Sequence, residues 1–124
     1  MEYMLRCRSF SVLWKLISTP EGLQRWLADE VTLTGDMLSF TWGHPWKQHQ
    51  VKEARLLSVN KSGYVRFRWD DDTDDVYVEL RIEKSPLTGD FTLHITDFSA
   101  DEDVDDMRGL WDEDLQRMHR NTGI

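Results

Sequence analysis

Hydrophobic and polar residues alternate through most of the chain between residues 31 and 96. A period of two is typical of strands that bury one face of a sheet. Short turn-forming stretches separate the alternating segments, as expected for strands that pair with their neighbours in an antiparallel meander. The predicted strands comprise residues 2–8, 31–34, 38–42, 51–59, 64–69, 76–83 and 91–96.

Two short helices are predicted between the first strand and the second. Ser9 or Ser11 can cap a helix whose apolar residues recur at helical spacing. Pro20 ends this helix and, with Thr19 before it as the N-cap, begins a second one. The apolar positions of the two helices are Val12, Leu13, Leu16, Ile17, Leu23, Trp26 and Leu27.

The C-terminal segment predicts a long amphipathic helix. Acidic residues crowd positions 101–106, where the helix dipole favours negative charge, and Gly123 lies just past the expected end. The apolar residues form one broad stripe: Val104, Met107, Leu110, Trp111, Leu115 and Met118. This stripe is long enough to cover the buried face of the sheet.

The order of elements predicts an α+β helix-grip fold in a single domain, residues 1–124. We expect a curved antiparallel sheet of about six to seven strands, two short helices after the first strand, and the long C-terminal helix packed on the sheet. Such a sheet leaves a space against its helix, which we expect to be an apolar cavity. The residues expected to line it are Trp42, Phe67, Trp69, Val78, Leu93, Met107, Trp111 and Leu115.

Composition limits the classes of partner that the protein is expected to bind. Six Trp, five Phe and three Tyr indicate either a core of large rings or an aromatic-lined cavity, and both remain open. The net charge of −8 argues against a nucleic-acid partner and against an anionic membrane surface. The lone Cys7 cannot form an internal disulfide, and no apolar run has the length of a signal or a membrane span. We therefore expect a cytoplasmic protein.

The sequence offers little catalytic or metal-binding chemistry. Asp70, Asp72 and Asp74 start like a calcium loop, but the glycine and the final glutamate of that loop are missing. His44 and His49 flank Trp46 in an irregular loop and are too few for a closed zinc site. No phosphate-binding glycine loop or nucleophile motif is present. We expect no catalytic residue, no metal and no cofactor, and regard an enzyme as the less favoured class.

Glu53 is the one carboxylate that could serve an enzyme. It shares a strand face with Arg55, whereas Lys52 and Ala54 lie on the other face. If the interior takes the first face, Glu53 becomes a polar group inside the cavity with a raised pKa. The alternative is an outward ion pair with Arg55.

Several segments resemble a known family. They are Leu13-Trp14, Ser18-Thr19-Pro20-Glu21-Gly22-Leu23, Trp26-Leu27-Ala28-Asp29, Val65-Arg66-Phe67-Arg68-Trp69, Leu87-Thr88-Gly89-Asp90, Ile95-Thr96-Asp97-Phe98 and Leu110-Trp111. Together they resemble the START-like (SRPBCC) superfamily, near the heat-shock-protein-90 ATPase activator homologues. Leu27, Val78 and Ser99 depart from the residues expected there. The resemblance implies the helix-grip fold and a hydrophobic cavity, but no reaction, because fold alone does not choose a function.

Two functions follow from these observations. The first is a non-catalytic domain that binds a small hydrophobic ligand between the sheet and the C-terminal helix. The alternative is a protein-interaction module, a homodimer or chaperone-associated adaptor, with a filled core and no ligand. That alternative predicts an exposed aromatic patch around Trp14, Trp26 and Trp46.

Overall fold

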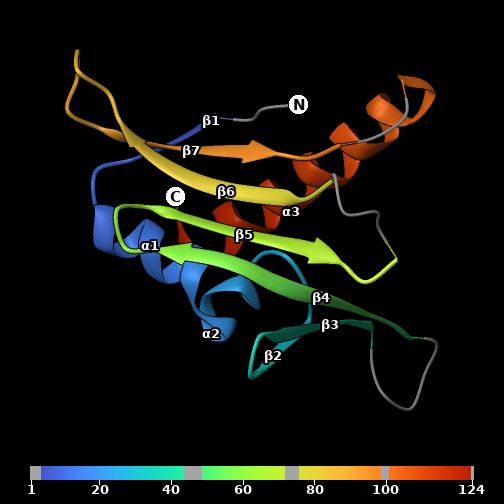
Figure 1. Ribbon diagram of the computed structural model, residues 1–124. Helices are drawn as coiled ribbons and strands as arrows, with labels where there is room; N and C mark the ends of the chain where they lie inside the picture. Colours follow the sequence, from blue (N-terminus) through green and yellow to red (C-terminus); the bar gives the residue numbers. More distant parts are fainter. Residues whose placement is uncertain (1–3, 44–48, 72–75, 99–100, 124) are drawn as a thin grey trace.

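A computed structural model describes residues 4–43, 49–71, 76–98 and 101–123. In these segments the chain forms seven strands and three α-helices, with one turn of 3-10 helix (Figure 1). The strands are β1 (Met4–Cys7), β2 (Glu30–Thr34), β3 (Met37–Gly43), β4 (His49–Asn60), β5 (Tyr64–Trp69), β6 (Val78–Lys84) and β7 (Phe91–Thr96). The helices are α1 (Phe10–Ser18), α2 (Pro20–Leu23), η1 (Asp101–Asp103) and α3 (Val104–Thr122).

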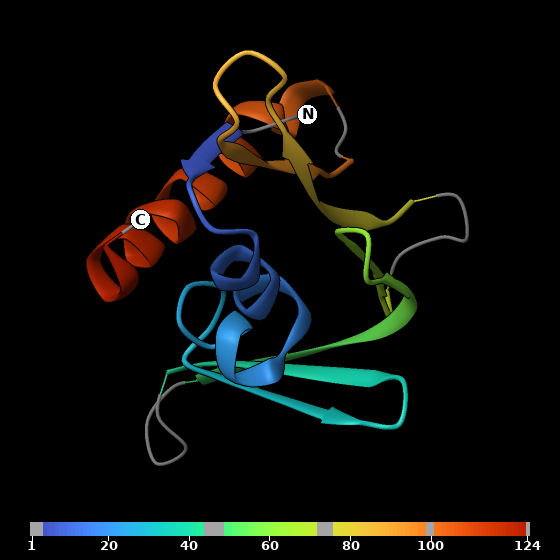
Figure 2. The same cartoon turned by 90° about the vertical axis from the view of Figure 1, so that its left-hand side faces the viewer.

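The strands form one antiparallel sheet in the order β1-β7-β6-β5-β4-β3-β2. Strands β2 to β7 form the predicted meander, and β1 joins it at the edge of β7. Figure 2 shows the sheet bending around α1 and α2, with α3 on the same concave side. The predicted α+β helix-grip fold is therefore confirmed, with the difference that α1 shares the concave face and lies against β5 and β6.

Capping residues fix where the two short helices begin. The Ser9 hydroxyl accepts a hydrogen bond from the Val12 backbone N–H at 3.3 Å, so Ser9 rather than Ser11 caps α1. The Thr19 hydroxyl accepts from the Gly22 backbone N–H at 2.9 Å, and Pro20 occupies the first position of α2. α2 ends at Leu23, because the next residues continue as turns.

Gly22 allows α2 to pack directly against α1. A Cβ at this position would lie 1.8 Å from the backbone oxygen of Lys15, which cannot move without displacing α1. We expect Gly22→Ala to destabilise the protein by about 2–3 kcal/mol or more in urea unfolding. The matched control is Gly109→Ala on α3, where a Cβ meets nothing within 4 Å. That change should stabilise the protein by about 0.5–1 kcal/mol. Equal effects from the two substitutions would contradict this account of Gly22.

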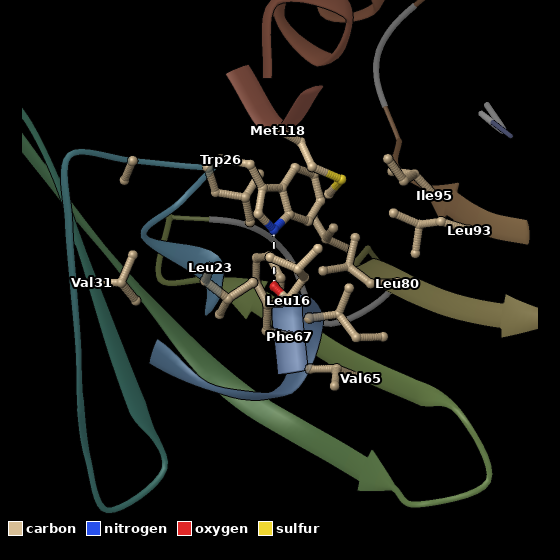
Figure 3. Packing of buried hydrophobic residues seen from close by; sticks show 14 of the residues in the cluster. Leu16, Leu23, Trp26, Val31, Val65, Phe67, Leu80, Leu93, Ile95 and Met118 are labelled. Atoms are coloured by element: carbon tan, nitrogen blue, oxygen red, sulfur yellow. Dashed lines mark hydrogen bonds between the residues drawn. The ribbon is translucent and has the colours of Figure 1, made fainter. Parts of the chain in front are cut away.

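Trp26 is the centre of the core. Its side chain is 0 % exposed, its indole Nε1 donates to the Leu16 backbone oxygen at 2.9 Å, and its ring lies 6.2 Å from that of Trp111. Figure 3 shows the indole between Met118 of α3 and the apolar side chains of α1 and the sheet. Trp26 therefore connects α1, α3 and the sheet. Its assignment to an exposed aromatic patch was wrong, since the residues that follow α2 fold back under α3.

The other two residues named for that patch are Trp14 and Trp46. Trp14 is partly buried and stacks on Phe10, with ring centroids 6.1 Å apart. Trp46 lies outside the described residues. Of the three residues named for that patch, the structure therefore buries Trp26 and leaves Trp14 partly exposed.

Helix α3 lies with most of its predicted stripe against the core. Trp111 and Met118 are buried, whereas Leu110 is 64 % exposed and belongs to the solvent side, contrary to its assignment to the stripe. The Trp111 Nε1 donates to the Asp97 carboxylate at 3.0 Å, beyond the end of β7. Near the other end of α3, the Arg25 guanidinium donates to the Asn121 backbone oxygen at 2.6 Å, and the Asn121 amide donates to the Arg25 oxygen at 2.7 Å. Polar contacts thus fix the helix at two points.

Candidate functional site

The eight residues predicted to line a cavity all belong to the core or pack against it. Four are buried, with exposures of 0 % for Phe67, 1 % for Val78, 0 % for Leu93 and 7 % for Trp111. The other four are half-buried and pack on the same cluster: Trp42, Trp69, Met107 and Leu115. The fold therefore brings the set together, while its role in binding a ligand stays a prediction.

Burial divides the eight residues into a filled part and an accessible part. A side chain without accessible surface touches no space large enough for a water molecule, whether that space is open or enclosed. Phe67 and Leu93 are therefore packed on every side by the protein's own atoms. A ligand would first contact the half-buried members, and could reach the deeper ones only if the side chains or α3 moved.

Four aromatic side chains on the concave face of β3 and β5 form what we call the aromatic end: Phe40, Trp42, Phe67 and Trp69. The Trp69 ring lies 5.1 Å from Phe40, 5.4 Å from Phe67 and 6.4 Å from Trp42 between centroids. The Trp42 indole Nε1 donates to the Leu27 backbone oxygen at 2.8 Å, which fixes the orientation of this ring. The aromatic end thus offers partly exposed ring surface in a defined geometry.

Lys52 is a cation on this apolar face that the sequence analysis did not assign to the site. It pairs with Phe40 across the β3–β4 ladder, so both side chains leave the sheet on the same face. Its Nζ lies 4.4 Å from the Trp69 ring centroid, a cation–π contact. Residues two apart on a strand share a face, and Ala54, two residues after Lys52, is fully buried. The alternation along β4 was therefore the sequence signal that could have placed Lys52 on this face.

The orientation of β4 also settles the position of Glu53. The interior takes the face of Lys52 and Ala54, so Glu53 is exposed on the convex face and outside any cavity. Arg55 shares that face and pairs with Asp36 at 3.2 Å instead of with Glu53. The outward position of Glu53 was the predicted alternative. Glu53 therefore cannot act as the cavity carboxylate that the enzyme hypothesis required.

A buried ion pair marks the convex face of the sheet. The Glu79 carboxylate is 8 % exposed and accepts hydrogen bonds from Arg81 at 2.9 Å and from Arg66 at 3.0 Å. Burial acts to raise the pKa of Glu79, but the hydrogen bonds from these two guanidinium groups outweigh it and hold the pKa below its usual value. The Arg81 and Arg66 guanidinium groups also lie over the rings of Tyr64 and Tyr77. This network joins β5 and β6, although the Arg66 Nε is buried and has no hydrogen-bond partner among the described residues.

Helix α3 carries a second ionisable group that the sequence analysis missed. Asp114 is half-buried beside the apolar stripe, and burial raises its pKa to about 7, with Glu113 adding to the rise and Arg117 opposing it. The Arg117 Nη1 is buried and has no hydrogen-bond partner among the described residues. The apolar stripe of α3 does not mark a charged residue at its edge, so the sequence pattern gives no signal for Asp114.

The remaining candidate groups add no site. Within residues 4–43, 49–71, 76–98 and 101–123, no cluster of His, Cys, Asp or Glu has the geometry of a metal centre. His44, Asp72 and Asp74 lie outside the described residues, as do the side chains of Cys7 and His49. Among the helices described, none has the length and apolar character needed to cross a membrane.

Comparisons with known proteins agree with this geometry. A comparison with curated proteins gave no significant match. Among solved structures, a protein from Bacteroides fragilis is 36% identical over 97% of this chain and 86% of its own, with a TM-score of 0.63. Two further neighbours share the fold alone. The Aha1 dimer from Colwellia psychrerythraea has 9% identity over 99% of this chain and 96% of its own, with a TM-score of 0.72. An AHSA1-like protein from Aeromonas hydrophila has 12% identity over 97% of this chain and 93% of its own, with a TM-score of 0.64.

The family assignment rests on the sequence as well as on the fold. The family model for the START-like superfamily domain matches residues 1–124. The curved antiparallel sheet, the two short helices after β1 and the long helix α3 are the architecture that the resemblance implied. The chain belongs to the START-like superfamily.

Proposed function

We propose that this protein binds a small hydrophobic molecule at the aromatic end, between the sheet and α3, without catalysing a reaction. The observation that carries the proposal is the half-burial of Trp42 and Trp69 above a closed apolar core, with Met107 of α3 packed on the same core. Partly exposed rings in a fixed geometry gain free energy when a ligand covers them, by roughly 25 cal/mol for each Å² of apolar surface removed from water.

Helix α3 is the element that would move to admit a larger ligand. No hydrogen bond joins its backbone to the sheet in the described residues, and side-chain contacts hold it at Trp111 and at Asn121. A helix held by side chains can shift by small amounts without breaking backbone pairing. The buried residues Phe67 and Leu93 would then become part of the binding surface.

The test compares two substitutions on one helix. Met107→Trp places a large ring at a half-buried position of α3 that packs on the core. Leu110→Trp places the same ring on the solvent side of α3, at a residue that is 64 % exposed. With Nile red as the fluorescent probe, Met107→Trp should weaken saturable binding about tenfold, or about 1.4 kcal/mol. Leu110→Trp should change it by less than about twofold. Equal effects of the two substitutions, or no saturable binding to the unmodified protein, would contradict the proposal.

The interaction module is the second candidate. Leu110 and Phe98 are large apolar side chains with exposures of 64 % and 46 %, and a stable contact between copies would cover such residues. This function predicts self-association in sedimentation that Leu110→Lys weakens. A monomer at all concentrations, together with saturable probe binding, would favour the ligand-binding function.

A further inference from the structure

Two polar side chains lie where helix α3 meets the core. Asp114 comes three residues after Trp111 and four before Met118, so it lies on the same side of the helix as these two buried residues. Arg117 follows Asp114 by three residues and is therefore its neighbour on the helix surface. Both side chains are half-buried.

Contacts of α3 show what this side of the helix faces. Asn121 follows Asp114 by seven residues, about two helical turns, so the two residues lie nearly in line. Asn121 exchanges two hydrogen bonds with Arg25, just after α2. The ring of the next residue, Trp26, lies 6.2 Å from the ring of Trp111. Asp114 is thus directed toward the region between α3 and the segment that follows α2.

Within the described residues, the protein leaves one buried polar atom of this pair without a partner. The Arg117 Nη1 is buried and donates to no atom of the described residues. In the same part of the chain, no hydrogen bond and no ion pair within 4.0 Å involves the Asp114 carboxylate. A buried donor without a partner lowers stability by about 1–3 kcal/mol, so a movement of α3 that let a ligand accept a hydrogen bond from it would recover this cost.

The protonation state of Asp114 tells which partner suits the pair. Burial raises its pKa to about 7, so at neutral pH a large fraction of this carboxyl group carries a proton and can donate a hydrogen bond. The charged groups that act on it are Arg117 and Glu113 of its own helix, and no described charged group of another element contributes. Beside it, the Arg117 guanidinium is a permanent donor whose geometry matches a carboxylate.

We propose that Arg117 and Asp114 bind the carboxylate of an amphipathic acid whose apolar body covers the neighbouring core residues. One carboxylate oxygen would accept from the half-buried Arg117 guanidinium and the other from the Asp114 hydroxyl. The inference rests on the proposed function and adds to it the chemical class of the ligand, a monocarboxylic acid with a hydrocarbon or aromatic body.

The experiment compares decanoic acid with decan-1-ol, which has the same chain without the charge. Displacement of Nile red is measured at pH 6 and pH 8 for the unmodified protein and for Arg117→Gln, Asp114→Asn and the exposed control Arg120→Gln. The unmodified protein should bind the acid about tenfold more tightly at pH 6 than at pH 8, because ionised Asp114 repels the ligand. Binding of the alcohol should not depend on pH.

The variants separate a binding role from a structural one. Arg117→Gln should weaken binding of the acid about tenfold or more and leave the alcohol within about twofold. Asp114→Asn retains an N–H donor, so it should keep acid binding and lose its pH dependence. Arg120→Gln should behave as the unmodified protein does.

Each contrary outcome has one meaning. If acid and alcohol bind alike to all variants, or if Arg117→Gln weakens both equally, the carboxylate site is excluded while the hydrophobic binding function stands. If neither molecule displaces the probe and the probe itself does not bind, the proposed function fails and this inference fails with it.

Discussion

We expect Asp114→Asn to stabilise the protein by about 2–4 kcal/mol at pH 8 and by less than about 1 kcal/mol at pH 4. The reason is the burial of the Asp114 carboxylate, which raises its pKa from 3.8 to about 7 in the folded protein. A difference of about three pKa units corresponds to about 4 kcal/mol, and the partial exposure of the side chain reduces this figure.

The sign follows from the two pKa values. Well below pH 3.8, the ordinary pKa of the group, it is protonated in both the folded and the unfolded chain, so it does not oppose folding. As the pH rises toward 7, the unfolded chain ionises while the folded protein keeps the proton, and stability falls. Above pH 7 the folded protein carries the buried charge and the loss is complete.

Urea unfolding of the two proteins across this pH range measures the effect directly. Taking the difference between variant and parent cancels the titration of other carboxylates, such as that of Glu79. Asp112→Asn, an exposed position on the same helix, is the matched control and should change stability by less than about 0.5 kcal/mol at either pH. A difference between parent and Asp114→Asn that does not grow with pH would show that Asp114 is not held in an apolar environment.

The second large effect is expected at Trp26. Trp26→Ala removes a fully buried ring that contacts Trp111 and a hydrogen bond to the Leu16 oxygen, and should lower the free energy of unfolding by about 3–5 kcal/mol. This loss is a large fraction of the stability of an ordinary domain, about 5–15 kcal/mol, so we expect the variant to fold only at low temperature or not at all.

Trp26→Phe keeps the experiment informative in that case. Phenylalanine retains most of the ring but leaves the Leu16 oxygen without its donor, so we expect a loss of about 1–3 kcal/mol. Trp14→Phe is the matched control, because this partly buried ring stacks on Phe10 and no described hydrogen bond involves its indole nitrogen. Equal losses from the two substitutions would contradict the role given to Trp26.

The fold could be predicted because its signals are local and repeated. In β5, Val65 and Phe67 alternate with Arg66 and Arg68, and this period predicts which face is buried. Val65 and Phe67 are buried as the period requires. Thr19 and Pro20 define the start of α2 through capping chemistry that needs no tertiary contact. Antiparallel pairing of neighbours then follows from the short turns.

The candidate site could be predicted only in part, because it depends on which helices and strands pack against each other in the folded protein. Leu110 and Trp111 are adjacent apolar residues on α3, and only the position of the helix decides that one is exposed and the other buried. Trp26 became the core centre because the segment after α2 returns beneath α3, which no local pattern encodes. Lys52 and Asp114 were missed because charged residues on buried faces contradict the hydrophobic pattern used to find those faces.

Native mass spectrometry of the protein purified from its natural host tests the central claim most directly. We predict a bound molecule, seen as a discrete addition to the mass of the 14.7 kDa chain that disappears when the protein is denatured. The Met107→Trp variant, produced in the same host, should lack this addition, and Leu110→Trp should keep it. A spectrum that shows only the mass of the monomer or of a dimer, with no added mass, would contradict a ligand-binding function and favour the interaction module.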